Sequence, residues 1–463
     1  MLKGLEISEI TLSQAQQDNE VFRFDAEYFG KEALAVIARM QSFGSDVLSS
    51  IATITDGIHT SLPFVDDGDV KVLSAKHPKE NFIDRSLFET ISAAFHAKNP
   101  RTALRENDVL ISTVGTIGNS AVVTSDLLPA NSDRHIGIVR LHKGTVSPYF
   151  LSTFLLGRFG RVQTWRETTG NVQPNLFISK IGKLLLPRVS DNFEKTVTQC
   201  VIRAYQLRAE SGQNLEQAEA TLLRALGLED WKAAEPLSYV RSSRDAFGAG
   251  RLDAQYFTPR VQALLDLLGK DGLTIADVAP PRRQRFDPTK AGNTFNYIEI
   301  GDVCTDGSVE SNTVATTAAP SRATQYVCSG DVLTSTVRPI RRLSALVDAL
   351  HGGSVCSSGF VVLEPKGVSA STMLTYLRLP LVCELMDLHT SASLYPAISE
   401  QDLLALPIPR IGGKVQSQVD ALVGAARQAK QRSSHLLNTA KRAVEIVIEQ
   451  NEKAAMAYLE VNT

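Results

Sequence analysis

Uninterrupted heptads occupy two stretches of this chain. In the first, residues that are apolar except for Arg208 and Ser211 recur at alternating steps of four and three residues from Val197 to Ala225. The same series returns 222 residues later, from Val419 to Val447, and every apolar position of one series is apolar in the other. A narrow apolar seam with this period is typical of a helix that packs lengthwise against another helix. We therefore predict two long helices, over residues 192–228 and 412–455, that pair as a coiled coil.

Each predicted seam has a serine near its middle. If the helices run antiparallel, Ser211 and Ser433 meet at the crossing point, where small side chains permit close approach. A polar layer there disfavours slipped registers, because a slip would bury it against apolar side chains. A helix docked on its own globule would explain one seam but not the matched pair. The predicted seam residues are Val197, Val201, Ala204, Ser211, Leu215, Leu222, Val419, Val423, Ala426, Ser433, Leu437 and Val444.

The rest of the chain is also duplicated, with the order of its segments kept. RFDAEYF (Arg23–Phe29) returns as RLDAQYF (Arg251–Phe257), and DVLISTVG (Asp108–Gly115) as DVLTSTVR (Asp331–Arg338). GIVRL (Gly137–Leu141) returns as GFVVL (Gly359–Leu363), and ISKIGKLLLP (Ile178–Pro187) as ISEQDLLALP (Ile398–Pro407). Each copy spans roughly 220 residues, the size of a whole domain rather than of a solenoid repeat.

Each copy mixes strand and helix patterns. The β-branched runs Val109–Val114 and Val332–Val337 predict strands, whereas Tyr149–Leu156 and Met373–Leu377 carry apolar residues at helical spacing. Prolines then precede each heptad segment. We predict an α+β fold of two tandem mixed α/β domains, over residues 1–191 and 229–411, each followed by its long helix.

Composition excludes several classes of protein. The five cysteines are scattered with no C-x-x-C pair, which argues against a disulfide framework or a structural zinc site and favours a reducing cytoplasm. We find no apolar run of membrane-spanning length and no secretory leader pattern. Phosphate-binding loops, H-E-x-x-H pairs and N-P-P-Y tetrapeptides do not occur. We therefore predict a cytoplasmic protein that is not itself an enzyme and binds no metal.

The net charge of −2 counts against a uniformly basic coat. Proteins that bind duplex nucleic acid usually carry a basic surplus. Any nucleic-acid contact must therefore come from locally clustered residues.

Together these features resemble the specificity subunit of Type I restriction–modification systems. The resemblance rests on RFDAEYF and RLDAQYF, on the strand and turn STVGTIG (Ser112–Gly118), and on ISxxxLLLP-like text followed by a heptad helix. It covers nearly the whole chain, and its strength lies in the order and repetition of weak motifs.

The resemblance implies a function and a set of partners. Each globule would be a target-recognition domain that reads one half of a bipartite site on double-stranded DNA. The two helices would pair antiparallel and bind two methyltransferase subunits, and motor/nuclease subunits would complete the restriction complex. S-adenosylmethionine would be bound by the methyltransferase partner, so no cofactor is expected in this chain.

Phosphates attract Lys, Arg and exposed backbone amides, whereas base edges are read by Arg, Lys, Asn, Gln, Ser and Thr with defined geometry. In the first copy, a basic cluster follows a predicted strand, and the loop TTGNVQPN (Thr168–Asn175) offers amides suited to adenine. The candidate DNA-binding residues there are Lys71, Lys76, His77, Lys79, Asn131, Arg134, Asn171, Gln173 and Asn175.

The second copy departs from the first at its turn. STVRPIR (Ser335–Arg341) lacks the glycines of STVGTIG, which indicates contact through side chains rather than backbone. PPRRQR (Pro280–Arg285) is a basic loop, and Ser391–Tyr395 takes the place of TTGNVQPN. The candidates there are Arg282, Arg283, Arg285, Arg338, Arg341, Arg342, Ser393 and Tyr395. A solvated polar loop would explain any one of these residues, so the set is better supported than its members.

Two other classes of function stay open on the sequence. A non-catalytic protein–protein scaffold with a coiled-coil strut fits the near-neutral charge. A stand-alone nucleic-acid-modifying enzyme fits the polar loops but lacks a recognisable catalytic motif. Under the favoured reading, helices of about 30 residues give a strut of roughly 45 Å, on the order of 13 base pairs of B-DNA.

Overall fold

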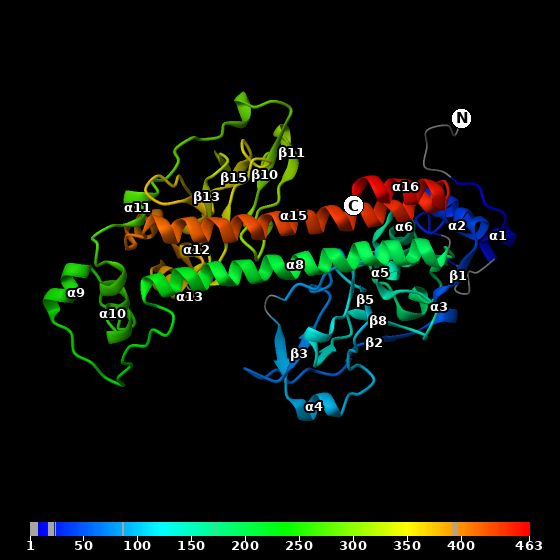
Figure 1. Ribbon diagram of the computed structural model, residues 1–463, viewed down its shortest axis with the longest axis horizontal. Helices are drawn as coiled ribbons and strands as arrows, with labels where there is room; N and C mark the ends of the chain where they lie inside the picture. The colour runs from blue at the N-terminus through cyan, green and yellow to red at the C-terminus, as the bar shows by residue number, and fades with distance from the viewer. Residues whose placement is uncertain (1–7, 17–22, 24, 86–87, 171, 392–395) are drawn as a thin grey trace. The chain divides into compact units, whose positions relative to one another are not determined.

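The structure is a computed structural model that describes residues 8–16, 23, 25–85, 88–170, 172–391 and 396–463 (Figure 1). The chain divides into two compact units. Unit 1 is Met1–Arg208 with Lys430–Thr463, and unit 2 is Ala209–Ala429. Two long helices, α8 (Asp191–Leu226) and α15 (Gly413–Glu449), contribute residues to both units. The fold is mixed α+β, with several small sheets and a pair of long helices.

Unit 1 combines short helices with short strands. Its helices besides α8 and α15 include α1 (Leu12–Gln16), α2 (Lys31–Phe43), α3 (Leu48–Ile51), α4 (Ala93–Ala97), η1 (Ser125–Leu127), α5 (Pro148–Leu156), α6 (Arg158–Glu167), α7 (Ile178–Ile181) and α16 (Glu452–Asn462). Its strands include β1 (Ser45–Val47), β2 (Ala52–Asp56), β3 (Val70–Leu73), β4 (Glu89–Ile91), β5 (Val109–Ser112), β6 (Ser120–Val122), β7 (Ala130–Ser132), β8 (Ile136–Leu141) and β9 (Leu185–Pro187).

The central sheet of unit 1 has the order β2-β8-β5-β6 and is antiparallel. A second sheet, β4-β3-β7, pairs β3 with β7 in parallel. The predicted strand at Val109–Val114 is confirmed as β5, and the predicted helix at Tyr149–Leu156 as α5. Leu110, Ile136 and Ile138 are fully buried and belong to the hydrophobic core of this sheet.

Unit 2 is built from a similar set of elements. Its helices besides α8 and α15 include α9 (Ser243–Ala249), α10 (Pro259–Leu268), α11 (Ile275–Val278), η2 (Pro288–Lys290), η3 (Ile300–Asp302), η4 (Thr316–Ala318), η5 (Pro339–Arg341), α12 (Ala370–Leu377), α13 (Pro380–Leu388) and α14 (Glu400–Ala405). Its strands include β10 (Thr294–Ile298), β11 (Asn312–Ala315), β12 (Ala323–Tyr326), β13 (Val332–Ser335), β14 (Ser344–Leu346), β15 (Val355–Ser357), β16 (Phe360–Leu363), β17 (Thr390–Ser391) and β18 (Ala397–Ile398).

The sheet β14-β13-β16 of unit 2 repeats the arrangement β6-β5-β8 of unit 1. In unit 1 Ser112 pairs with Ile136, and in unit 2 the equivalent Ser335 pairs with Phe360. The strand register therefore places Phe360 where unit 1 has Ile136. The sequence match of GIVRL with GFVVL is offset from this register by two residues. A shift of two keeps each side chain on its face, because successive side chains alternate between faces.

The two long helices run antiparallel within unit 1. The Cys200 thiol donates to the carbonyl of Leu436 at 3.4 Å, and the Ser433 hydroxyl donates to the carbonyl of Ala204 at 2.7 Å. Residue numbers rise along α8 as they fall along α15, as antiparallel packing requires. The predicted meeting of Ser433 with Ser211 is wrong. The Ser433 hydroxyl instead donates to the backbone carbonyl of Ala204, seven residues before Ser211. A register displaced by one heptad keeps the same apolar seam.

The predicted seam residues lie on the inner faces of these helices. In unit 1, Val197, Val201, Ala204, Ser433 and Val444 are buried, and Leu437 is half-buried. In unit 2, Ser211, Leu222, Val419, Val423 and Ala426 are buried, and Leu215 packs against the same core. Helix α16 then turns back along the end of α15, where His435 Nε2 lies 2.9 Å from the carbonyl oxygen of Asn462 (Figure 1). Within the described ranges, the helices all lack the combined length and apolar character that crossing a membrane requires.

Candidate nucleic-acid interface

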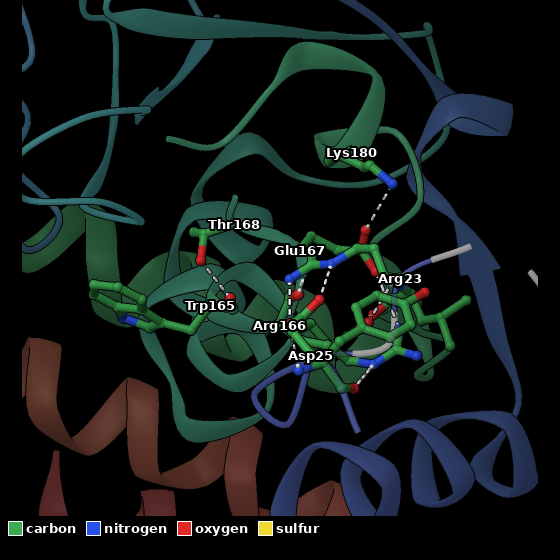
Figure 2. Close-up of polar contacts among 10 residues, drawn as sticks. Arg23, Asp25, Trp165, Arg166, Glu167, Thr168 and Lys180 are labelled. Carbon is green, nitrogen blue, oxygen red and sulfur yellow. Dashed lines mark hydrogen bonds and ion pairs between the residues drawn. The ribbon is translucent and has the colours of Figure 1, made fainter. Parts of the chain in front are cut away.

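The motif RFDAEYF anchors the end of a helix in unit 1. Arg23 forms a bidentate pair with Asp25, with both N–O distances 2.7 Å, and donates to the carbonyl of Arg166 at 3.2 Å. The Arg166 guanidinium lies 3.7 Å from the centroid of the Tyr28 ring. Figure 2 shows Arg23, Asp25 and Arg166 gathered at the C-terminal end of α6. The hydrogen bonds that Arg23 donates to Asp25 raise the pKa of Arg23, so this arginine stays charged.

The buried carboxylate of Glu167 completes this cluster. Its oxygens lie 3.1 Å from a side-chain nitrogen of Arg166 and 3.6 Å from the side-chain nitrogen of Lys180 (Figure 2). Because Lys180 belongs to α7, these ion pairs connect α7 to the end of α6, where the hairpin begins. The next residue, Thr168, turns its hydroxyl back to the carbonyl of Trp165 at 2.7 Å. The cluster therefore fixes the direction in which the chain leaves the helix.

The motif RLDAQYF does the same in unit 2. Arg251 pairs with Asp253 at 2.8 Å through both nitrogens and donates to the carbonyl of Leu388 at 2.8 Å, at the end of α13. Its guanidinium lies 4.4 Å from the Tyr256 ring centroid. His389 replaces Glu167, and its ring lies 3.2 Å from Arg251. Burial, with the charge of Arg251, lowers the pKa of His389, which favours the neutral ring. Both copies of the motif are thus structural anchors.

Three chain segments meet beyond this anchor in unit 1, and we call them the first platform: the turn 113–118, the loop 133–135 and the hairpin formed by the described residues 168–170 and 172–175. Thr169 and Asn175 close the hairpin with two backbone hydrogen bonds of 2.9 and 2.8 Å. The Leu176 amide donates to the carbonyl of Thr113 at 2.9 Å, and the Thr113 amide donates to the carbonyl of His135 at 3.0 Å. Backbone bonds therefore tie the three segments together.

Unit 2 repeats these bonds at the equivalent positions, in the turn 336–342, the loop 357–359 and the described residues 390–391 and 396–397, which we call the second platform. Ser391 pairs with Ala397 in its hairpin. The Ile398 amide donates to the carbonyl of Thr336 at 3.0 Å, and the Thr336 amide donates to the carbonyl of Gly359 at 2.9 Å. The two platforms share a backbone, and they differ in the side chains that they present.

A half-buried arginine braces the turn of each platform. In unit 1, Arg161 of α6 donates to the carbonyl of Ile117 at 3.3 Å and to Asn119 at 3.0 Å. In unit 2, Arg378 after α12 donates to the carbonyls of Arg342 and Ser344, at 2.7 and 3.1 Å. Burial lowers the pKa of both arginines. Sequence reasoning missed these braces because they come from different helix positions and share no motif.

The second turn adopts glycine-like backbone at arginine residues. Gly115 has φ +66° in unit 1, and its equivalent Arg338 has φ +50°. Arg342, four residues on, has φ +59°. A side chain in this left-handed region costs roughly 1–2 kcal/mol, and such strain concentrates at functional sites. The glycines are missing from the sequence, but the backbone shape that they allow is kept.

This strain predicts that glycine is more stabilising than alanine at position 338, the reverse of their order within a helix. Arg338→Gly should have a free energy of unfolding about 1 kcal/mol higher than Arg338→Ala, because glycine has no Cβ to clash in the left-handed region. At the exposed Glu210 in the interior of helix α8, glycine should instead be less stable than alanine by about 1 kcal/mol. Urea denaturation of the four variants measures both differences. An alanine variant at 338 at least as stable as the glycine variant would contradict the argument.

A buried ion pair lies behind each platform. In unit 1, Asp108 and Arg140 lie one step beyond the Val109–Val139 pair of β5 and β8, and Arg140 binds Asp108 through two nitrogens at 2.8 and 2.7 Å. In unit 2, the corresponding step beyond the Val332–Leu363 pair has Asp331 on one side and an acid, Glu364, on the other. Arg282 reaches in from the neighbouring segment instead, at 2.6 and 2.8 Å from Asp331 and 3.3 Å from Glu364. The hydrogen bonds that Arg282 donates to Asp331 raise the pKa of Arg282.

The structure sorts the sequence candidates by exposure. Lys76, Arg134, Gln173, Arg283, Arg285 and Arg341 are exposed, and Lys71, Lys79, Asn175, Arg282, Arg338 and Arg342 are half-buried. His77 and Asn131 are buried, at 1% and 0% exposure. Asn171, Ser393 and Tyr395 lie outside the described residues. The first platform brings together Arg134, Gln173 and Asn175, and the second brings together Arg338, Arg341 and Arg342.

Several candidates have structural partners. His77 accepts from the Ser74 amide at 2.8 Å and stacks on Phe88, and burial lowers its pKa. The amide of Asn131 contacts His96 at 3.2 Å. Arg282 holds Asp331, Arg283 pairs with Glu400 at 2.6 Å, and Arg342 pairs with Glu219. Their geometry favours folding roles over direct contact with a ligand.

Other residues that the sequence did not predict as candidates adjoin the platforms. Gly57 lies so close to the loop 133–135 that a Cβ there would be 2.0 Å from the carbonyl oxygen of Asp133. The exposed His59 follows it and pairs with Asp56 at 2.5 Å. In unit 2, the carbonyl of the exposed Arg322 accepts from the Ser358 amide at 2.7 Å. In the part of the chain that the structure describes, no three His, Cys, Asp or Glu side chains gather as metal ligands.

No family model matches this sequence, and no curated protein matches it. Solved structures do resemble it. The S subunit of a Type I restriction–modification system from M. genitalium is 11% identical over 88% of this chain and 95% of its own, with a TM-score of 0.41. The HsdS subunit from Thermoanaerobacter tengcongensis is 16% identical over 90% and 95%, with a TM-score of 0.27. A chain from a study of assembly of the type I R-M system is 16% identical over 90% and 96%, with a TM-score of 0.28. The structural neighbours of this chain are thus Type I restriction–modification S subunits.

Proposed function

We propose that this chain is a sequence-specific DNA-binding subunit of a Type I restriction–modification complex. Unit 1 and unit 2 each read one half of a bipartite site. The observation that carries the proposal is the pair of platforms, which share their backbone hydrogen bonds and differ in their exposed side chains. A conserved frame with exchanged polar groups is what two readers of different base sequences require, because base edges are discriminated by side-chain donors and acceptors.

The chain contributes recognition and no catalysis. Two methyltransferase subunits supply the methyl transfer with their own S-adenosylmethionine, and motor/nuclease subunits supply cleavage. This assignment agrees with the sequence motifs and with the anchoring role of RFDAEYF and RLDAQYF in both units.

The helix pair is proposed to set the spacer between the half-sites. Removing one heptad from each helix, at matched positions, should shorten the spacer by about 3 base pairs, since seven residues span about 10.5 Å. The half-site sequences should stay the same. Methylome sequencing of cells that carry the shortened chain measures both quantities. Altered half-site sequences with an unchanged spacer would contradict this assignment.

A protein scaffold is the second candidate, and the net charge of −2 with paired arginines such as Arg282 and Arg283 favours it. Duplex binding in the presence of the methyltransferase partner, measured between 50 and 200 mM salt, separates the two. A DNA reader making several phosphate contacts should lose roughly a thousandfold in affinity. Cells lacking the chain should also lose methylation at a bipartite motif. A scaffold would show neither result.

A further inference from the structure

We propose that unit 2 reads a guanine in the major groove through Arg341, whereas the first platform has no basic side chain at the equivalent turn. This inference rests on the proposed function and specifies the base and the residue at one position of the second half-site.

The turn that carries Arg341 is held rigidly from several directions. Pro339 is buried beneath it, and Arg342 pairs with Glu219 of α8. The Arg338 amide donates to the carbonyl of Pro396 at 2.8 Å, which ties the turn to the hairpin. Arg378 braces its far end. Between these fixed points Arg341 is exposed, and its neighbour Ile340 is 51% exposed. A rigid turn that carries one exposed guanidinium is the arrangement that precise recognition needs.

The turn does not need an arginine at this position in order to fold. Unit 1 builds its turn from Gly115, Thr116, Ile117 and Gly118, with no cation. In unit 2 two non-glycine residues keep left-handed backbone so that the longer turn can form. Arg338 and Arg342, the strained residues, are half-buried, and Arg341 between them is exposed. The strained backbone therefore places the Arg341 side chain at the surface of the turn.

Guanine is the base that matches this group. A guanidinium donates two parallel hydrogen bonds to the O6 and N7 acceptors of guanine, the commonest specific contact in the major groove. A phosphate contact is the alternative use of an exposed arginine, and it would carry no base preference. The two uses predict different outcomes for the same variant.

The test selects duplexes from a randomised library with the full chain bound to its methyltransferase partner. The wild-type complex should select a guanine at one position of the half-site read by unit 2. Arg341→Ala should reduce the preference for that guanine by about tenfold or more, and Arg341→Gln should shift it toward adenine. Lys270→Ala removes an exposed cation of unit 2 outside the platform and should leave the preference unchanged.

Replacing the selected guanine with 7-deazaguanine removes the N7 acceptor. This change should weaken binding by the wild type and leave binding by Arg341→Ala unaffected. If Arg341→Ala selects the same bases but binds all sequences more weakly, the arginine contacts phosphate and the inference is wrong. If the wild-type complex selects no sequence at all, the proposed function fails instead.

Discussion

Arg282→Ala should lower the free energy of unfolding by about 3–5 kcal/mol, because it leaves the carboxylate of Asp331, which is 2% exposed, buried without its cation. Glu364, whose carboxylate lies 3.3 Å from Arg282, adds a second negative charge next to it. Urea denaturation of the full chain, with hydrogen exchange to locate the loss within unit 2, measures the effect. A loss below about 1 kcal/mol would mean that the pair adds little to folding.

Unit 1 provides the design of a rescue. There the arginine and the aspartate, Arg140 and Asp108, lie one step beyond the last residues that pair between β5 and β8. The double change Arg282→Thr with Glu364→Arg recreates this arrangement in unit 2 and should recover most of the lost stability. Glu364→Gln in place of Glu364→Arg is the matched control, since it removes the acid without supplying a cation. Equal stability of the two double variants would show that the position of the arginine is not what matters.

Gly57→Ala should destabilise unit 1 by about 3 kcal/mol, the upper range for inserting a methyl group where no space exists. The added Cβ would lie 2.0 Å from the carbonyl oxygen of Asp133 and 2.3 Å from that of Ser132. Both are backbone atoms, so the loop 133–135 must move. Under the proposed function, base preference should then fall in the half-site read by unit 1 and be kept in the other half-site.

Gly424→Ala is the control for this substitution. Gly424 lies within α15, and a Cβ there would meet no atom within 4 Å. Alanine should stabilise the helix by up to about 1 kcal/mol. If Gly57→Ala were as stable as Gly424→Ala, the close approach of residue 57 to the loop would not constrain the fold.

Repetition made parts of the architecture predictable. The heptads located both long helices, and RFDAEYF with RLDAQYF marked equivalent places before their role was known. The pairing of Arg23 with Asp25 and of Arg251 with Asp253 explains why these letters recur. The predicted register of the two paired helices was wrong. Ser433 bonds to the carbonyl of Ala204, and a heptad pattern cannot distinguish registers that differ by seven residues.

The candidate site was predicted less well than the fold, because composition does not reveal pairing. Arg282 and Arg283 stand in a basic run, but their acids, Asp331 and Glu400, lie 49 and 117 residues away in sequence. One clue was present. The aspartate of DVL is kept in both copies, while the arginine of GIVRL is absent from GFVVL. A buried aspartate that is present in both copies, but lacks the arginine in one of them, must be neutralised there by a cation from another segment.

The relocated arginine also limits which hybrid chains can arise by genetic exchange between the two copies. A crossover that joins β2 of unit 1, which pairs with the strand of Arg140, to β16 of unit 2, which Glu364 follows, would leave two acids and no arginine. The reciprocal hybrid would place Arg140 and Arg282 against one aspartate. Viable recombinants must therefore inherit both segments from the same parent. Breakpoints should be rare between residues 57 and 136 or between 283 and 360, and common near the long helices.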